Sequence, residues 1–306
     1  MWFSSFGEVM HKAKLRSSTQ RNTAFSAPLT LPLCLPTAVS SGIITLASAT
    51  NTCDKTVSNQ SIGKLMKKIY LAFFISLITF SVAWAQKDYR KSVTIFGDSY
   101  STFVGYITPA TNESWYFTDH RIKDNDVDNV EQTWWHQLLK KNDWKLCMNN
   151  SYSGSTISSS GYRGEDYTPR SFVTRAPNLG NPDIIFIFGA TNDSWVPSPV
   201  GEYKYEGWTT DDLKAFRPSL AKLLDYMTKR YLGVEMYFIL NSDLSDAIDA
   251  SVFKICDHYG VPVIALHDID KKAGHPSIEG MKAIAEQVDA YVKNAQKNVK
   301  KTHKKK

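Results

Sequence analysis

Five short apolar segments, each long enough for one β-strand and separated by helical patterns, constrain the fold of this chain most strongly. We place them near residues 91–96, 144–149, 183–189, 234–240 and 261–266. Strand and helix signals that alternate in this way are typical of a parallel sheet with helical crossovers. The third segment is continuously apolar after its first residue, as expected of a central strand covered on both faces. The sequence therefore predicts one α/β domain, a three-layer α/β/α sandwich on a five-stranded parallel sheet.

The first 85 residues do not share this pattern. Residues 1–65 lack sustained periodicity, and Met66-Lys-Lys then precedes an apolar run from Ile69 to Val82 and the small-x-small triplet Ala83-Trp-Ala85. A charged start, an apolar run and a small-residue cleavage site in this order indicate a secretory signal peptide. The run is shorter than the roughly 20 residues that span a bilayer. A membrane anchor or a buried helix is the alternative interpretation.

These observations predict the organisation of the chain. We expect translation to begin at Met66, which makes residues 1–65 a disordered upstream extension and residues 66–85 the signal peptide. Cleavage after Ala85 would leave Gln86 first, and the lack of a cysteine there argues against a lipid anchor. The mature domain would cover residues 86–292. We expect it to be exported, periplasmic or secreted, from a bacterium, with no membrane anchor after cleavage.

The positive net charge does not belong to the predicted domain. The chain carries a formal charge of +6, but residues 1–85 hold 8 Lys or Arg against 2 Asp or Glu, and residues 293–306 hold 7 Lys. The 21 basic and 28 acidic residues that remain give residues 86–292 a charge of −7. Nucleic-acid binding through a basic face is therefore not supported. The lysine-rich tail, residues 293–306, is expected to be disordered.

Metal and disulfide chemistry receive little support. Cys147 lies in a predicted strand and Cys256 in a predicted helix, so they either pair or remain free thiols. No Cys/His spacing suggests zinc. Residues 124–128 are similar to the start of a calcium loop, but Asn129 replaces the turn glycine and Trp135 the bidentate glutamate. We interpret this stretch as a solvated acidic turn and expect no metal and no cofactor.

The loops that follow four of the predicted strands carry polar or small residues. They are Ser99, Gly154, Asn192 and His275. The carboxyl ends of parallel strands meet at one edge of a sheet, where open α/β folds bind ligands. We therefore expect these four residues to lie close together.

The four segments resemble the motifs of the GDSL or SGNH hydrolase superfamily. The matching stretches are Phe96-Gly-Asp-Ser99, Asn149 to Gly154, Thr191-Asn-Asp193 and Gly274-His-Pro276, and the resemblance spans residues 93–280. It implies a flavodoxin-like sheet and a serine esterase that forms an acyl-enzyme. It also implies that Ser99 is the nucleophile, that His275 is the general base, and that the oxyanion hole comprises the backbone N–H groups of Ser99 and Gly154 with the Asn192 amide.

The chain departs from the family pattern at two positions. Ala190 stands where the third motif usually begins with glycine, and a small residue is expected to preserve the turn. Lys272 stands where the acid that orients the histidine is expected, three residues before His275. Asp270, or alternatively Asp268, would reach the histidine if the loop bulges, and Asp270 is preferred because it is nearer. A Ser–His dyad with a backbone carbonyl holding the imidazole is the other possibility.

The substrate is the least constrained part of the prediction. Aromatic residues that include Trp115 and Trp195 lie in the loops after the first and third strands, where they would suit a sugar ring or simply pack the loops. Arg170 and Arg175 would meet an acidic sugar or balance the acidic surface. We expect an esterase that removes small acyl groups, chiefly acetyl, from a glycan. A lysophospholipase or short-chain lipase is the runner-up, and a glycan-binding domain without activity is disfavoured by the Ser99–His275 pair.

Overall fold

The computed structural model of the chain describes residues 59–84, 89–119, 121–196 and 198–303, and it divides into two units, Met1–Phe80 and Ser81–Lys306. Helix α2, Asn59–Trp84, is the element described before the domain. Residues 59–65 are therefore helical, which corrects the expected disorder there, whereas residues 1–58 lie outside the described residues. Within the described ranges, no helix is long and apolar enough to cross a membrane. The signal peptide at 66–85 stays a prediction.

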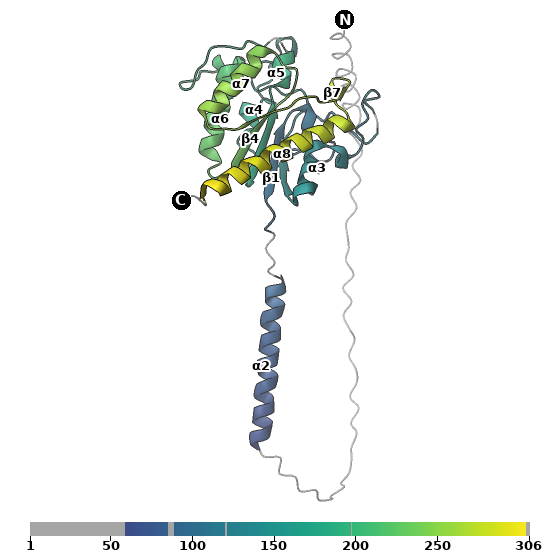
Figure 1. Cartoon of the computed structure of the whole chain (residues 1–306), viewed down its shortest axis with the longest axis vertical. Coiled ribbons are helices and arrows are strands. Elements are labelled where there is room, and N and C mark those ends of the chain that lie inside the picture. The colour runs from purple at the N-terminus through teal and green to yellow at the C-terminus, as the bar shows by residue number, and fades with distance from the viewer. Residues whose placement is uncertain (1–58, 85–88, 120, 197, 304–306) are drawn as a thin grey trace, which may run out of the picture. The chain divides into compact units, whose positions relative to one another are not determined.

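A five-stranded parallel sheet forms the centre of the second unit and confirms the predicted fold class (Figure 1). Its strands lie in the order β2-β1-β3-β4-β5, the flavodoxin-like order. Each strand falls within or close to a predicted segment. The bounds are β1 Ser92–Gly97, β2 Lys145–Asn149, β3 Ile184–Gly189, β4 Glu235–Leu240 and β5 Val263–Ala265.

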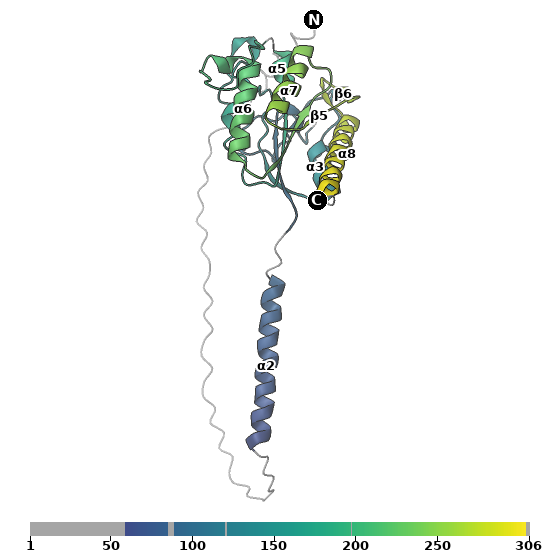
Figure 2. The ribbon, with the colours of Figure 1, turned by 60° about the vertical axis from the view of Figure 1, so that its left-hand side comes forward.

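The central strand explains how the three layers hold together. Every residue of β3 is buried, and its side chains alternate between the two faces of the sheet. Ile185 and Ile187 join the apolar core that also contains residues of α6 and α7. Phe186 and Phe188 contact the ring of Trp134 in α3 on the opposite face. Figure 2 shows the resulting sandwich, with α6 and α7 on one side of the strands and α3 and α8 on the other.

The helices and 3-10 turns connect the strands. The α-helices of this unit are α3 Trp134–Asn142, α4 Phe172–Arg175, α5 Thr191–Trp195, α6 Phe216–Arg230, α7 Asp246–His258 and α8 Ile278–His303. The 3-10 turns are η1 Ser99–Ser101, η2 Val130–Gln132, η3 Tyr162–Gly164 and η4 Asp212–Lys214, and a small hairpin joins β6 Lys271–Lys272 to β7 His275–Pro276.

Helix α8 corrects the prediction of a disordered tail from residue 293. The helix continues to His303, and residues 304–306 lie outside the described part of the chain. Lysine is a good helix former, and the Nζ atom of Lys293 lies 2.9 Å from a carboxylate oxygen of Asp289 one turn earlier. A run of lysines that follows an amphipathic helix can therefore extend it.

The two domain cysteines occupy their predicted elements and do not pair. Cys147 is exposed in β2 and Cys256 is buried in α7, and both are free. Burial in α7 raises the pKa of the Cys256 thiol far above its usual range, so Cys256 behaves as a small apolar side chain of the core.

Candidate active site

Ser99 lies directly beyond the carboxyl end of β1, in the first position of η1. The carboxylate of Asp98 caps this turn by accepting a 3.0 Å hydrogen bond from the backbone N–H of Tyr100. The preceding Gly97 has no room for a side chain, because an added Cβ would lie 2.5 Å from Ser101. The strand end and the turn thereby fix Ser99, which is only 3% exposed.

His275 lies in β7 and meets Ser99, as the sequence predicts. The Nε2 atom of His275 is 2.9 Å from the Oγ atom of Ser99, and Nδ1 is 3.1 Å from the carbonyl oxygen of Ala273. A carbonyl oxygen only accepts, so this contact places the ring proton on Nδ1 and leaves the Nε2 lone pair facing the serine hydroxyl. Burial lowers the pKa of His275 to about 3, opposed by the Ala273 contact and reinforced by the charge of Lys271. A neutral imidazole in this tautomer can accept the serine proton.

Asp270 and Asp268 are not brought to the histidine, which corrects the preferred assignment of the orienting acid. The carboxylate of Asp270 accepts a hydrogen bond from the Ser277 hydroxyl, which itself accepts from the backbone N–H of Gly280 at the start of α8. Asp268 is exposed and lies 2.9 Å from the ring of His267. The physical reason is the route of the loop, which turns at Ala273 and Gly274 with φ of 51° and 73°. This turn presents a main-chain carbonyl to Nδ1, as the dyad alternative expected.

Gly154 and Asn192, which are expected in the oxyanion hole together with Ser99, lie on neighbouring segments. Gly154 has φ +74°, a left-handed conformation that favours glycine. The Asn192 side chain, at the start of α5, donates a 2.9 Å hydrogen bond from Nδ2 to the carbonyl oxygen of Ser155, in the residue after Gly154. An amide nitrogen carries two N–H groups, so Nδ2 can make one further hydrogen bond. Ala190 retains the left-handed turn before α5, with φ of 74°.

Tyr162 is a residue of the site that the sequence did not reveal. Its hydroxyl donates a 3.0 Å hydrogen bond to Oδ1 of Asn192, which fixes the amide so that Nδ2 points the other way. Burial raises the pKa of Tyr162 well above its usual range, so the phenol remains a donor. Tyr162 begins a 3-10 turn that is preceded by Gly161 and ends at Gly164. No periodic signal connects such a turn with α5.

Asp193 links the same two loops. Its carboxylate accepts from the backbone N–H groups of Ile157 and Ser158, at 2.7 and 3.1 Å, and from the Ser158 hydroxyl. Burial raises the pKa of Asp193 to about 6 despite these hydrogen bonds, and burial raises the pKa of Asp98 to about 7. Two buried carboxyl groups thus hold the site's segments, Asp98 the turn η1 and Asp193 the loop at Ile157 and Ser158.

Arg175 and Arg170 have different positions, and the structure corrects the first. Arg175 is 6% exposed, and its guanidinium donates to the main-chain carbonyls of Asn150, Gly97 and Arg170. It holds the second loop from inside and is not placed to meet a sugar. Arg170 is partly buried beside Gly154, where an added Cβ would be 3.7 Å from its Nη1 atom. Its guanidinium covers the rings of Tyr152 and Tyr167.

Trp115 and Trp195 do not form one shared aromatic surface for a sugar, because they lie differently around His275. The ring of Trp115 stacks on the imidazole of His275 with 3.6 Å between centroids and 8° between planes. Trp115 is only 6% exposed, which corrects its assignment to substrate binding. Trp195 is half-buried and meets the same imidazole edge-on at 5.9 Å, so it remains at the rim of the site.

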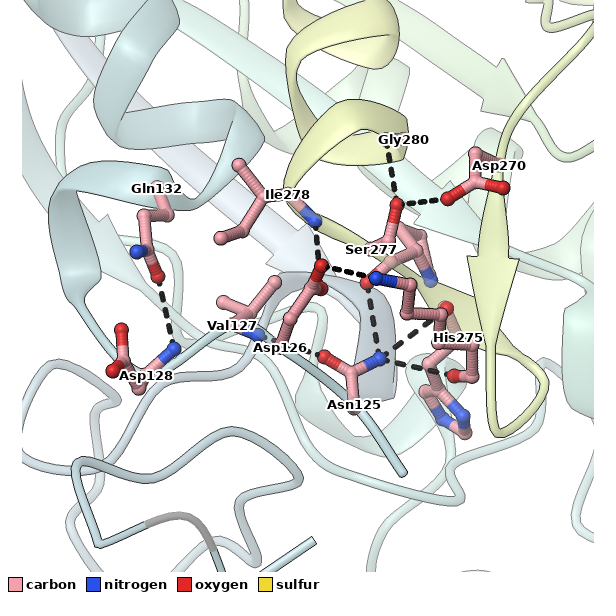
Figure 3. Close-up of polar contacts among 12 residues, drawn as sticks. Asn125, Asp126, Val127, Asp128, Gln132, Asp270, His275, Ser277, Ile278 and Gly280 are labelled. Carbon is pink, nitrogen blue, oxygen red and sulfur yellow. Dashed lines mark hydrogen bonds and ion pairs between the residues drawn. The ribbon is translucent and has the colours of Figure 1, made fainter. Parts of the chain in front are cut away.

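The stretch 124–128 holds the segment that carries the histidine, which corrects its interpretation as a solvated acidic turn. The Asn125 side chain is buried and donates from Nδ2 to the carbonyl oxygens of Lys272 and Pro276, at 3.0 and 3.2 Å (Figure 3). The Asp126 carboxylate accepts from the Lys272 ammonium and from the backbone N–H of Ile278. Lys272, which occupies the usual acid position, is therefore neutralised by another loop. In the part of the chain that the structure describes, no cluster of three or more His, Cys, Asp or Glu could hold a metal ion.

Comparison with known proteins identifies the family. The family described as GDSL-like Lipase/Acylhydrolase matches residues 91–292. The solved structure of a GDSL-like lipase protein from Bacteroides ovatus is 56% identical, with 67% of this chain and 99% of that chain covered and a TM-score of 0.66. A second, from Bacteroides uniformis, is 49% identical, with 67% and 96% covered and the same TM-score of 0.66. No curated protein matches the chain. The chain belongs to the GDSL-like lipase/acylhydrolase family, and it is an ester-bond hydrolase.

Proposed function

We propose that this hydrolase removes small acyl groups, chiefly acetyl, from a carbohydrate, with Ser99 as nucleophile and His275 as general base. The observation that carries the assignment of the two residues is the 2.9 Å contact between Ser99 Oγ and the Nε2 atom of His275. The tautomer fixed by the Ala273 carbonyl directs the lone pair of Nε2 at the Ser99 hydroxyl, so Nε2 can take its proton.

The reaction follows from this geometry. Ser99 Oγ attacks the ester carbonyl carbon while its proton passes to Nε2 of His275, and the carbonyl electron pair moves onto oxygen. The backbone N–H groups of Ser99 and Gly154 and the Asn192 amide would receive this negative charge, each lowering the barrier by about 3 kcal/mol. Collapse of the intermediate breaks the bond to the leaving alcohol, which takes the proton from Nε2. Water then hydrolyses the acyl-enzyme by the same route.

The burial and polarity of the site support a small acyl group on a polar alcohol. Ser99 is 3% exposed, which favours a short acyl group over a long one. The rim beside Gly154 is formed by Arg170, whose side chain is 18% exposed and lies 3.5 Å from the carboxylate of Glu113. Such a charged rim suits sugar hydroxyl groups better than a lipid chain. The half-buried Trp195 adds an aromatic surface that a sugar ring could cover.

We also propose that the enzyme acts outside the cytoplasm. The pattern of residues 66–85 supports this location, because it has the charged start, apolar run and cleavage site of a secretory signal.

The proposal is tested with p-nitrophenyl esters of increasing chain length, with acetylated xylan and with a lysophospholipid. Wild type should prefer the acetyl ester and release acetate from the polysaccharide. Ser99→Ala should lose at least about 1,000-fold in kcat, because the nucleophile is gone. A fluorophosphonate should label Ser99 in wild type only.

Two results would contradict the proposal in different ways. Equal activity in wild type and Ser99→Ala would reject Ser99 as nucleophile. A preference for long acyl chains or for the lysophospholipid would move the function to a lipase and reject the carbohydrate.

A further inference from the structure

The stacked pair of Trp115 and His275 places an aromatic face against the group that gains positive charge in the reaction. The two rings are almost parallel, 8° apart, with 3.6 Å between their centroids. The face of an indole carries partial negative charge and attracts a cation above it. A neutral imidazole gains little electrostatic stabilisation from this face, whereas an imidazolium gains much more.

We propose that Trp115 is a further catalytic residue, which stabilises the imidazolium form of His275 through its indole face while the proton of Ser99 resides on Nε2. This inference rests on the proposed function, because it concerns the same proton transfer. The indole face would supply the charge stabilisation that a carboxylate at the position of Lys272 would otherwise provide.

Burial strengthens the interaction. His275 is 1% exposed and Trp115 is 6% exposed, so little water competes for the charge. The other rings near the imidazole meet it at steeper angles. Tyr100 is tilted by 55° at 5.1 Å, and Trp195 is almost perpendicular at 5.9 Å. The charge of Lys271 destabilises the imidazolium, so the attraction of the Trp115 face would have to counter this repulsion.

The main chain that carries the indole is held by the nucleophile's own turn. The backbone N–H of Trp115 donates a 2.8 Å hydrogen bond to the hydroxyl of Thr102, and that hydroxyl donates at 2.9 Å to the carbonyl oxygen of Ser99. The next residue, Tyr116, donates from its hydroxyl to the carbonyl oxygen of Pro276, beside the histidine. Trp115 is thereby fixed to both partners of the proton transfer before substrate arrives, which is the preorganisation that electrostatic catalysis requires.

The test replaces Trp115 by mono-, di- and trifluorotryptophan, which withdraw charge from the indole face with little change in shape. We expect log kcat to fall stepwise with fluorination, to about 30-fold for the last member, as for a desolvated cation–π interaction. KM and Tm should stay close to wild type. The same series at Trp144, which directly precedes β2 and stacks on Phe186, is the matched control and should change kcat less than about twofold.

Trp115→Phe and Trp115→Leu add a second comparison. Phe keeps an aromatic face and should retain more activity than Leu at equal stability. A flat response of kcat to fluorination at Trp115 would reject the inference and leave the residue a packing role.

Fluorophosphonate labelling of Ser99 separates this result from failure of the proposed function, because labelling needs the same base but no knowledge of the natural ester. Wild type that is neither labelled nor active would reject the proposed function itself. If wild type is labelled but kcat does not change on fluorination of Trp115, the result would reject the Trp115 inference alone.

Discussion

The imidazole of His275 is oriented by a main-chain carbonyl and covered by an indole. These two contacts take the two roles of an orienting acid, which are to select the tautomer and to stabilise the positive charge. The Ala273 carbonyl selects the tautomer, since it can only accept from Nδ1. The face of Trp115 lies where the charge develops. Burial keeps the imidazole neutral in the free enzyme by lowering the pKa of His275 to about 3. The imidazole is therefore neutral throughout the physiological pH range.

Asp270 belongs to the start of α8 in this arrangement, so its removal should affect stability more than rate. We expect Asp270→Asn to keep kcat within about threefold of wild type, because Nδ1 of His275 does not depend on this carboxylate. Asp270→Ala should lower the free energy of unfolding by about 1 kcal/mol, because the Ser277 hydroxyl loses its acceptor. Ester hydrolysis and urea unfolding measure the two effects. Asp268→Asn, at an exposed position, is the control.

A loss of two orders of magnitude in kcat for Asp270→Asn, with folding unchanged, would overturn this arrangement. It would show that Asp270 moves to the histidine when substrate binds.

The segments beyond the carboxyl ends of the sheet strands, with their short turns, assemble the site. The segment between η1 and α3 supplies Trp115 and Asn125, which contact the histidine ring and the histidine segment. The turn η3 supplies Tyr162, which contacts the amide of Asn192 in α5. The four family motifs could be placed at one sheet edge from the sequence because each follows an apolar strand. The contacts made by Trp115, Asn125 and Tyr162 could not, because they join distant loop residues whose route has no periodic signal.

Tyr162→Phe tests the contribution of η3. The substitution removes only the hydroxyl that donates to Oδ1 of Asn192, so the amide loses one constraint on its orientation. We expect kcat to fall about fivefold, the equivalent of one hydrogen bond, with little change in KM. Tyr226→Phe, which removes the same hydroxyl from the exposed face of α6, should change neither constant. An unchanged kcat in Tyr162→Phe would exclude a role for this turn in positioning the amide.

The fold as a whole was more accessible to prediction than the site. Each strand falls in a short, mostly apolar segment, and the continuous burial of β3 follows from a sheet covered on both faces. The ends of the chain were less accessible. The segment 293–303 continues α8, although its lysines suggested a solvated tail, because helix propensity and the Lys293–Asp289 pair favour the helix. Composition alone does not distinguish a charged helix from a charged coil.

The hydrolase unit should fold without the residues that precede it. The structure separates Ser81–Lys306 from Met1–Phe80, and the family match begins at residue 91. The Bacteroides ovatus protein, 56% identical, is covered over 99% of its own length by 67% of this chain, so a chain of domain length forms this fold.

A protein that comprises residues 86–306 should therefore have the Tm of the full chain within about 2 °C. Its kcat on an acetyl ester should also match, because the contacts that position Ser99 and His275 come from residues within this unit. Calorimetry and ester hydrolysis on both proteins measure this. A Tm lower by about 5 °C or more would mean that the earlier residues contribute to the domain's stability.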